Sequence, residues 1–192
     1  PSDFQLRGNL FHSLLERVFN VDGELPNVDD AVRMVEKAFD ERLPLDAAPL
    51  ARPEKRVESQ RLKTRLARAT RLFVETLTTG GYNRVQIEVP VDGSAFGKRM
   101  QGSIDCVAST DDDREAVVDF KYAGRKKFND MISEGRSVQL ATYAHSRRQP
   151  GENYPAVAYL VLSESKIFTP SGSPLAGVDH AQVLDGPSIE RV

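Results

Sequence analysis

Two acidic residues and one lysine stand where neighbouring strands could bring them together. Asp119 and Lys121 lie two positions apart in the run 115–122, in which residues 116–118 and 120 are apolar. Because side chains alternate faces along a strand, these two point the same way. Burying either charge without a partner costs several kcal/mol. The pair is therefore either a structural ion pair at a sheet edge or part of a site that compensates both charges.

Asp105 favours the second interpretation. It interrupts the apolar strand pattern over 99–108, and the polar run 109–114 that follows suits a hairpin loop. Antiparallel neighbours would bring Asp105 towards Asp119, and two close carboxylates repel each other unless a cation separates them. Carboxylate oxygens suit Mg²⁺ or Mn²⁺. Lys121 could then orient an attacking water and offset charge on a phosphoryl group, so the pattern indicates metal-dependent phosphodiester cleavage.

Two further segments carry candidate residues. Gln139 and Tyr143 lie four positions apart on a predicted helix and share a face, and Arg136 lies one turn earlier on that face. The amide and the hydroxyl can hydrogen-bond a carboxylate, a metal-bound water or a DNA phosphate. The alternative is a helix that packs its tyrosine on the sheet and leaves the amide in solvent.

Taken together, the motifs resemble those of a known group. The segments Gly-Ser-Ile-Asp at 102–105, Val-Val-Asp-Phe-Lys at 117–121 and Gln-Leu-Ala-Thr-Tyr at 139–143 occur in the order of the PD-(D/E)XK nuclease superfamily, and the helix at 8–16 carries a histidine as its RecB-like exonuclease branch does. The resemblance implies an α/β fold with a restriction-endonuclease-like core, in which helices flank a central mixed β-sheet in the order α-β-β-β-α-β. Extra helices would precede that core.

The resemblance also implies roles for individual residues. The implied metal ligands are the carboxylates of Asp105 and Asp119, the imidazole of His12 and the main-chain carbonyl of Phe120. Lys121 would be the catalytic lysine, with Gln139 and Tyr143 facing the site. Ile104 stands where the family name has proline, and Cys106 stands where the RecB-like branch commonly has arginine.

Two of the acidic and histidine positions have competing interpretations. His12 lies at the margin of the apolar stripe of its helix, so spacing alone favours a half-exposed surface residue, whereas the resemblance favours a ligand. Glu88 lies in a strand predicted over 84–91, on the face opposite its apolar residues. For Glu88 we favour a solvated position over one in the site.

The charge distribution suggests where nucleic acid would bind. The formal net charge is -2, but 52–71 is mostly basic and could track a phosphate backbone. The alternative is a solvated helical face. Arg125, Lys126 and Lys127 follow the Lys121 strand by one short loop, and we expect them, with Arg136, to contact DNA.

Composition bounds the remaining possibilities. With 192 residues and 40% hydrophobic content, we expect one nuclease domain over 1–192, excised from a longer chain, with a tail of uncertain order at 170–192. The single cysteine excludes an internal disulfide and a four-cysteine iron-sulfur cluster, and favours a cytoplasmic setting. No apolar run is long enough to span a membrane, and no P-loop is present.

These observations lead to one function and its alternatives. We expect an Mg²⁺- or Mn²⁺-dependent DNA nuclease, an exonuclease of end processing, recombination or repair, with a helicase module in the same or a partner chain. The alternative is an inactive nuclease-fold domain that binds DNA or scaffolds a helicase complex. The predicted helices lie near 6–20, 28–43, 53–78 and 127–148, and the predicted strands near 84–91, 99–108, 115–122 and 156–163.

Overall fold

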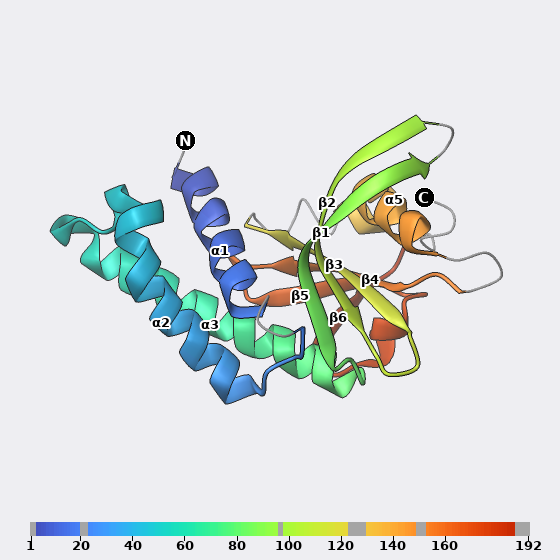
Figure 1. Ribbon diagram of the computed structural model, residues 1–192, viewed down its shortest axis with the longest axis horizontal. Coiled ribbons are helices and arrows are strands. Elements are labelled where there is room, and N and C mark those ends of the chain that lie inside the picture. Colours follow the sequence, from blue (N-terminus) through green and yellow to red (C-terminus); the bar gives the residue numbers. More distant parts are fainter. Residues whose placement is uncertain (1–2, 20–22, 96–97, 123–129, 149–152, 187–192) are drawn as a thin grey trace.

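Four α-helices and a six-stranded sheet make up most of the part of the chain that the structure describes (Figure 1). The computed structural model describes residues 3–19, 23–95, 98–122, 130–148 and 153–186. The helices are α1 (Asp3–Phe19), α2 (Val28–Asp46), α3 (Arg56–Thr79) and α5 (Val138–Arg147). The strands are β1 (Arg84–Ala95), β2 (Lys98–Ser109), β3 (Glu115–Lys121), β4 (Ala156–Val161), β5 (Lys166–Pro170) and β6 (Ala181–Leu184).

The sheet is mixed, and its strands follow chain order from β1 to β6. The β1–β2, β2–β3 and β4–β5 pairs are antiparallel, whereas β3–β4 and β5–β6 are parallel. The parallel step from β3 to β4 requires a crossover, and α5 lies within it. This is the α/β arrangement that the sequence predicts, with α1, α2 and α3 on one side of the sheet and α5 on the other (Figure 1).

Two apolar cores hold these layers together. The helix-side core joins α1, α2 and α3 to the sheet, and the α5-side core lies under α5. Phe120 of β3 packs edge-to-face on Phe11 of α1 and Phe73 of α3, with ring centroids 6.2 and 5.6 Å apart. Because Phe11 precedes His12, the same contact that anchors α1 on β3 positions the histidine.

The helix predicted at 127–148 is interrupted, and this part of the prediction is wrong. Residues 130–133 are helical, but Gly135 then takes φ +66°. The N–H groups of Gly135 and Arg136 donate to the carbonyls of Ile132 and Met131, which is the hydrogen-bond pattern of a Schellman stop. A new helix, α5, begins only at Val138.

The hairpin of β1 and β2 is longer than predicted. Its ladder continues to the pair Ala95 and Lys98, beyond the predicted strand bounds of 84–91 and 99–108. In Figure 1 the outer half of this hairpin leaves the sheet and lies beside α5. Strand β5 was not predicted, and β6 lies within the tail 170–192 whose order the sequence left uncertain.

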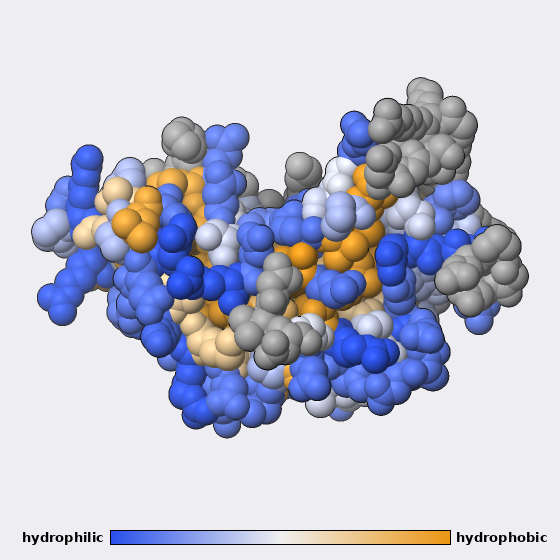
Figure 2. Space-filling view, viewed as in Figure 1, coloured by the Kyte–Doolittle hydropathy of each residue, from blue (hydrophilic) through white to orange (hydrophobic). Residues whose placement is uncertain are grey.

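The segment between the helices predicted near 28–43 and 53–78 is ordered. Two short 3-10 turns, Ala48–Leu50 and Pro53–Lys55, fill it, and Pro44 lies inside the last turn of α2. Among the described helices, none combines the length and apolar character needed to cross a bilayer. In the view of Figure 2, hydrophilic side chains dominate the helical layer, and apolar surface gathers where that layer meets the sheet.

Candidate active site

Strands β2 and β3 separate at Asp105, and this separation opens the site. Their ladder ends at the pair Cys106 and Val118, so Asp105 and Asp119, the next two residues in register, are not paired. Oδ2 of Asp105 instead accepts a hydrogen bond of 2.7 Å from the main-chain N–H of Phe120. A side-chain carboxylate thus replaces the acceptor of the missing ladder bond, and the edge of β3 beyond Val118 is left open.

His12 and Glu88 complete a cluster around Asp105. Nδ1 of His12 lies 3.4 Å from Oε1 of Glu88 and 4.0 Å from Oδ1 of Asp105. One ligand atom of each residue lies within 4.8 Å of the others. The Asp105 side chain is 13% exposed, compared with 31% for His12 and 35% for Glu88. The cluster is therefore open to solvent on the side of the histidine and the glutamate.

The backbone at Glu88 explains how a residue of β1 reaches this cluster. Glu88 has φ +55°, a left-handed conformation that is uncommon outside glycine. Val85 and Ile87 pack in the helix-side core, but Val89 and Val91, which share their parity, pack in the α5-side core. The strand therefore changes faces across Glu88. Ile104 and Cys106 are divided between the cores in the same way on either side of Asp105, so the hairpin bends at the site.

We predict that this backbone strain is measurable. Glu88→Gly and Glu88→Ala both remove the carboxylate, but only glycine tolerates positive φ without steric cost. Glu88→Gly is expected to be more stable than Glu88→Ala by about 1 kcal/mol, the reverse of the usual order in a strand. Urea unfolding of the two variants in the presence of a chelator measures the difference. Equal stabilities would mean that residue 88 relaxes to ordinary strand geometry.

Asp119 is the most deeply buried charge of the site. Its side chain is 0% exposed, and Nζ of Lys121 lies 2.6 Å from its Oδ2. Within the described residues this contact does not have hydrogen-bond geometry, and both carboxylate oxygens are buried without a hydrogen-bond partner. We treat the contact as a close ion pair. The pKa of Asp119 is raised to about 7: burial is the main cause, the ammonium of Lys121 opposes the rise, and the nearby carboxylate of Asp105 adds to it.

Lys121 links the acidic residues to α5. Its Nζ donates to Oε1 of Gln139 at 3.3 Å, and Nε2 of Gln139 donates to the hydroxyl of Tyr143 at 3.2 Å. Gly102 of β2 faces that hydroxyl, since a Cβ at Gly102 would lie 4.0 Å from it. The structure thus connects Asp119, Lys121, Gln139 and Tyr143 in one chain of polar contacts that ends at the outer hairpin.

Other candidates do not join this chain. Arg136 precedes α5 rather than lying on it, so it does not share the face of Gln139 and Tyr143; its guanidinium pairs with Glu134 at 2.5 Å. The Schellman stop at Gly135 is the reason. Phe120 contributes an N–H to Asp105, whereas a ligand role for its carbonyl stays a prediction. Arg125, Lys126 and Lys127 lie outside the described residues.

The residues present fit a divalent cation. Oxygen ligands on an octahedral Mg²⁺ or Mn²⁺ lie about 3.0 to 4.2 Å apart, given contacts of about 2.1 Å. Nδ1 of His12 lies 3.4 Å from Oε1 of Glu88 and 4.0 Å from Oδ1 of Asp105, and both separations fall within this range. Burial also raises the pKa of Asp105, although His12 and the Phe120 N–H oppose that rise. Burial thus destabilises the charged forms of both Asp105 and Asp119, and the oxygens of Asp119 have no hydrogen-bond partner among the described residues. A bound cation would stabilise both charged forms.

The sequence of the chain matches the model of a known protein family. The family model of the PD-(D/E)XK nuclease superfamily matches residues 1–183. The chain belongs to the PD-(D/E)XK nuclease superfamily. A search of curated proteins found no match to it. The match covers the elements described above except the last residue of β6, and it includes the helices that precede the sheet.

Membership in the PD-(D/E)XK superfamily identifies the fold as restriction-endonuclease-like and implies a nuclease that uses divalent metals. Sequence reasoning placed Glu88 on a solvated face, whereas the structure places it against His12. Its register with Asp105 could have indicated this, since the hairpin pairs Ile87 with Cys106 and Val89 with Ile104 on either side. The left-handed backbone that turns Glu88 into the cluster has no sequence signal.

Proposed function

We propose that this PD-(D/E)XK protein is an Mg²⁺- or Mn²⁺-dependent deoxyribonuclease. The observation that carries the proposal is the convergence of three ligand types beside a buried carboxylate and a lysine, at the place where β2 and β3 separate. A structural ion pair alone would not require His12 and Glu88 to approach Asp105. Nor would it leave both oxygens of Asp119 without hydrogen bonds in the described part of the chain.

We assign a role to each residue of the candidate site from its position. His12, Glu88 and Asp105 would hold the ion, and Asp119 would join them once it is ionised. The bound ion supplies Lewis acidity, which polarises a phosphate oxygen and lowers the pKa of water. Lys121, held between Asp119 and Gln139, is placed to orient the attacking water and to offset negative charge in the transition state.

We infer that Gln139 and Tyr143 position the ammonium of Lys121. Their mutual hydrogen bond fixes the amide so that its oxygen faces Lys121. The ammonium is thus restrained on two sides, by a charge and by a neutral acceptor. Restraint of this kind lowers the reorganisation needed in the transition state.

A finer proposal rests on the order of the motifs. The RecB-like resemblance of segments 102–105, 117–121 and 139–143 supports an exonuclease in end processing, recombination or repair, fed by a helicase module in the same or a partner chain. The alternative is an inactive domain that binds DNA or scaffolds such a complex.

An assay for cleavage tests the proposal. End-labelled linear DNA, single- and double-stranded, is incubated with the protein and Mg²⁺, Mn²⁺ or a chelator. We expect products with either ion and none with the chelator, and an exonuclease releases the labelled end as short products. Binding of DNA without cleavage in both ions would support the inactive alternative, as would the absence of both activities.

A further inference from the structure

The basic helix α3 divides its charges between two faces. On the face towards α2, Lys63 pairs with Asp40 at 2.6 Å and Arg71 pairs with Asp29 at 2.9 Å. Near its start, Lys55 pairs with Glu58, which also binds Arg7 of α1. These basic residues are compensated by carboxylates, so they contribute to the packing of the helical layer and little to the external field.

The opposite face carries uncompensated charge. Arg56, Arg61, Arg65 and Arg68 are exposed, and none has a carboxylate within ion-pair distance among the described residues. Their positions fall within one stripe with Val57, Gln60 and Thr64, since the spacings of three and four residues keep side chains on one helix face. From Arg56 to Arg68 the stripe covers about 18 Å of helix axis.

This stripe forms one wall of a groove. The other wall is the turn between β4 and β5, Ser163 to Ser165, and the groove, which is open to solvent, has a volume of about 1010 Å³. The hydroxyl of Ser165 donates to the main-chain carbonyl of Arg65 at 3.2 Å, which ties the turn to the helix. Glu164 is the single acidic residue among those that line the groove. The walls are therefore dominated by arginine.

The groove begins close to the candidate active site. Val161 of β4 is the partner of Lys121 in the parallel ladder, and the N–H of Leu162 donates to the carbonyl of Lys121 at 2.9 Å. Ser163 follows Val161 by two residues, at most about 7 Å of chain. The end of the groove at Ser163 is thus close to the strand end that carries Lys121.

We propose that this groove binds the phosphate backbone of single-stranded nucleic acid and guides it to or from the active site. Four arginines in a row match the regular charges of one strand, and the guanidinium planes can bind phosphates or stack on bases. The open groove, with its volume of about 1010 Å³, has room for a few nucleotides of a single strand. This inference rests on the proposed nuclease function and adds to it the path of the substrate.

Binding of a single strand at varied salt tests the inference. Affinity for a fluorescent, mixed-sequence oligonucleotide is measured by anisotropy in a chelator, which prevents cleavage, between about 50 and 200 mM salt. The variant Arg61→Gln with Arg65→Gln removes two groove charges. Its matched control, Lys63→Gln with Arg71→Gln, removes two charges from the other face of α3. We expect the groove variant to bind several-fold more weakly, with the slope of log K against log salt reduced by about 1.4, or 0.7 for each lost phosphate contact.

The control variant is expected to keep the wild-type slope. An unchanged slope in the groove variant, an equal effect in both variants, or no binding by the wild type would overturn the inference. Displacement of the oligonucleotide by polyglutamate at equal charge would also overturn it, in favour of an acidic protein partner. Groove-dependent binding without any metal-dependent cleavage would instead contradict the proposed nuclease and leave the groove assignment standing.

Discussion

Lys121→Met is expected to lower the rate of DNA cleavage by about 10²–10³-fold, the usual effect of removing one donor that stabilises charge in a transition state. The methionine keeps the length and apolar stem of lysine but has no ammonium to face Asp119 and Gln139. Binding of Mn²⁺, measured by calorimetry, should persist, because Lys121 supplies no ligand and its positive charge opposes a cation. The separation of these two readouts distinguishes a catalytic lysine from a merely structural ion pair.

Two other variants serve as controls for Lys121→Met. Lys166→Met changes a lysine of β5 that is paired with Val161, itself the neighbour of Lys121, and it should cleave at the wild-type rate. Asp105→Asn should lose both cleavage and Mn²⁺ binding, although its amide oxygen can still accept the N–H of Phe120. If Lys121→Met cleaved DNA as fast as Lys166→Met does, the pair of Asp119 and Lys121 would be structural.

Strand periodicity was sufficient to predict the centre of the site. Alternation places Asp119 and Lys121 on one face of β3, and the polar loop at 109–114 fixes an antiparallel neighbour that carries Asp105. Both inferences depend only on local geometry with a period of two, which a sequence displays directly.

Features that depend on departures from regular geometry could not be predicted. The left-handed backbone at Glu88 reverses the faces of β1, so a pattern that indicates a solvated glutamate leads instead to the cluster. The stop at Gly135 separates Arg136 from α5, although Arg136 has the right spacing to share a face with Gln139. A glycine inside a helical pattern is tolerated often enough that the sequence alone did not indicate the break.

The division of charge between the two faces of α3 could not be predicted from the sequence either. The sequence shows a basic segment and an acidic one, but which lysines and arginines are compensated depends on how α2 packs against α3. Lys63 and Arg71 meet carboxylates of α2, whereas Arg61 and Arg65 face the turn between β4 and β5. Tertiary packing therefore determines which face of the basic helix α3 carries uncompensated positive charge.

In the absence of metal, Asp119 is expected to make the protein less stable as the pH rises. The folded-state pKa of about 7 lies above the ordinary value of 3.8. The buried carboxyl group therefore costs nothing below about pH 4, where it is protonated in both states, and its cost grows until the pH passes about 7. A shift of this size corresponds to about 4 kcal/mol.

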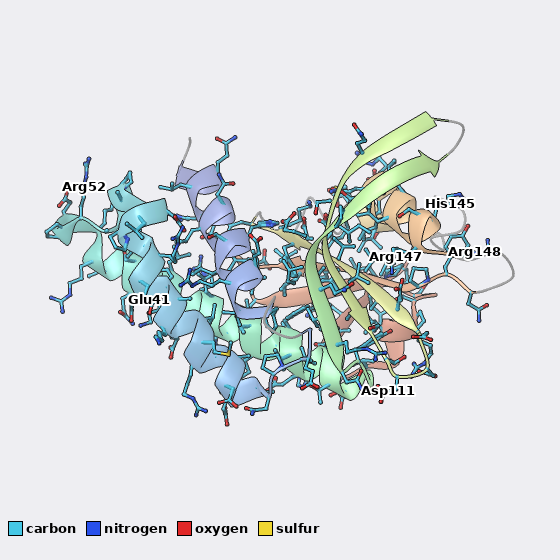
Figure 3. All side chains as sticks on the ribbon, viewed as in Figure 1. Glu41, Arg52, Asp111, His145, Arg147 and Arg148 are labelled. Carbon is cyan, nitrogen blue, oxygen red and sulfur yellow. The ribbon has the colours of Figure 1, made fainter. Side chains whose placement is uncertain are left out.

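Asp119→Asn removes this dependence, because the amide does not titrate. The free energy of unfolding of Asp119→Asn, relative to that of wild type, should rise by up to about 4 kcal/mol between about pH 4 and pH 8 in chelator. Urea unfolding at a series of pH values measures it, with Asp111→Asn, at the exposed turn between β2 and β3 (Figure 3), as the matched control. Saturating Mn²⁺ should reverse the order at high pH, since a cation favours the ionised carboxylate of the wild type. A difference in the free energy of unfolding that does not change with pH would contradict this prediction. It would show that folding does not raise the pKa of Asp119, because Lys121 alone compensates its charge.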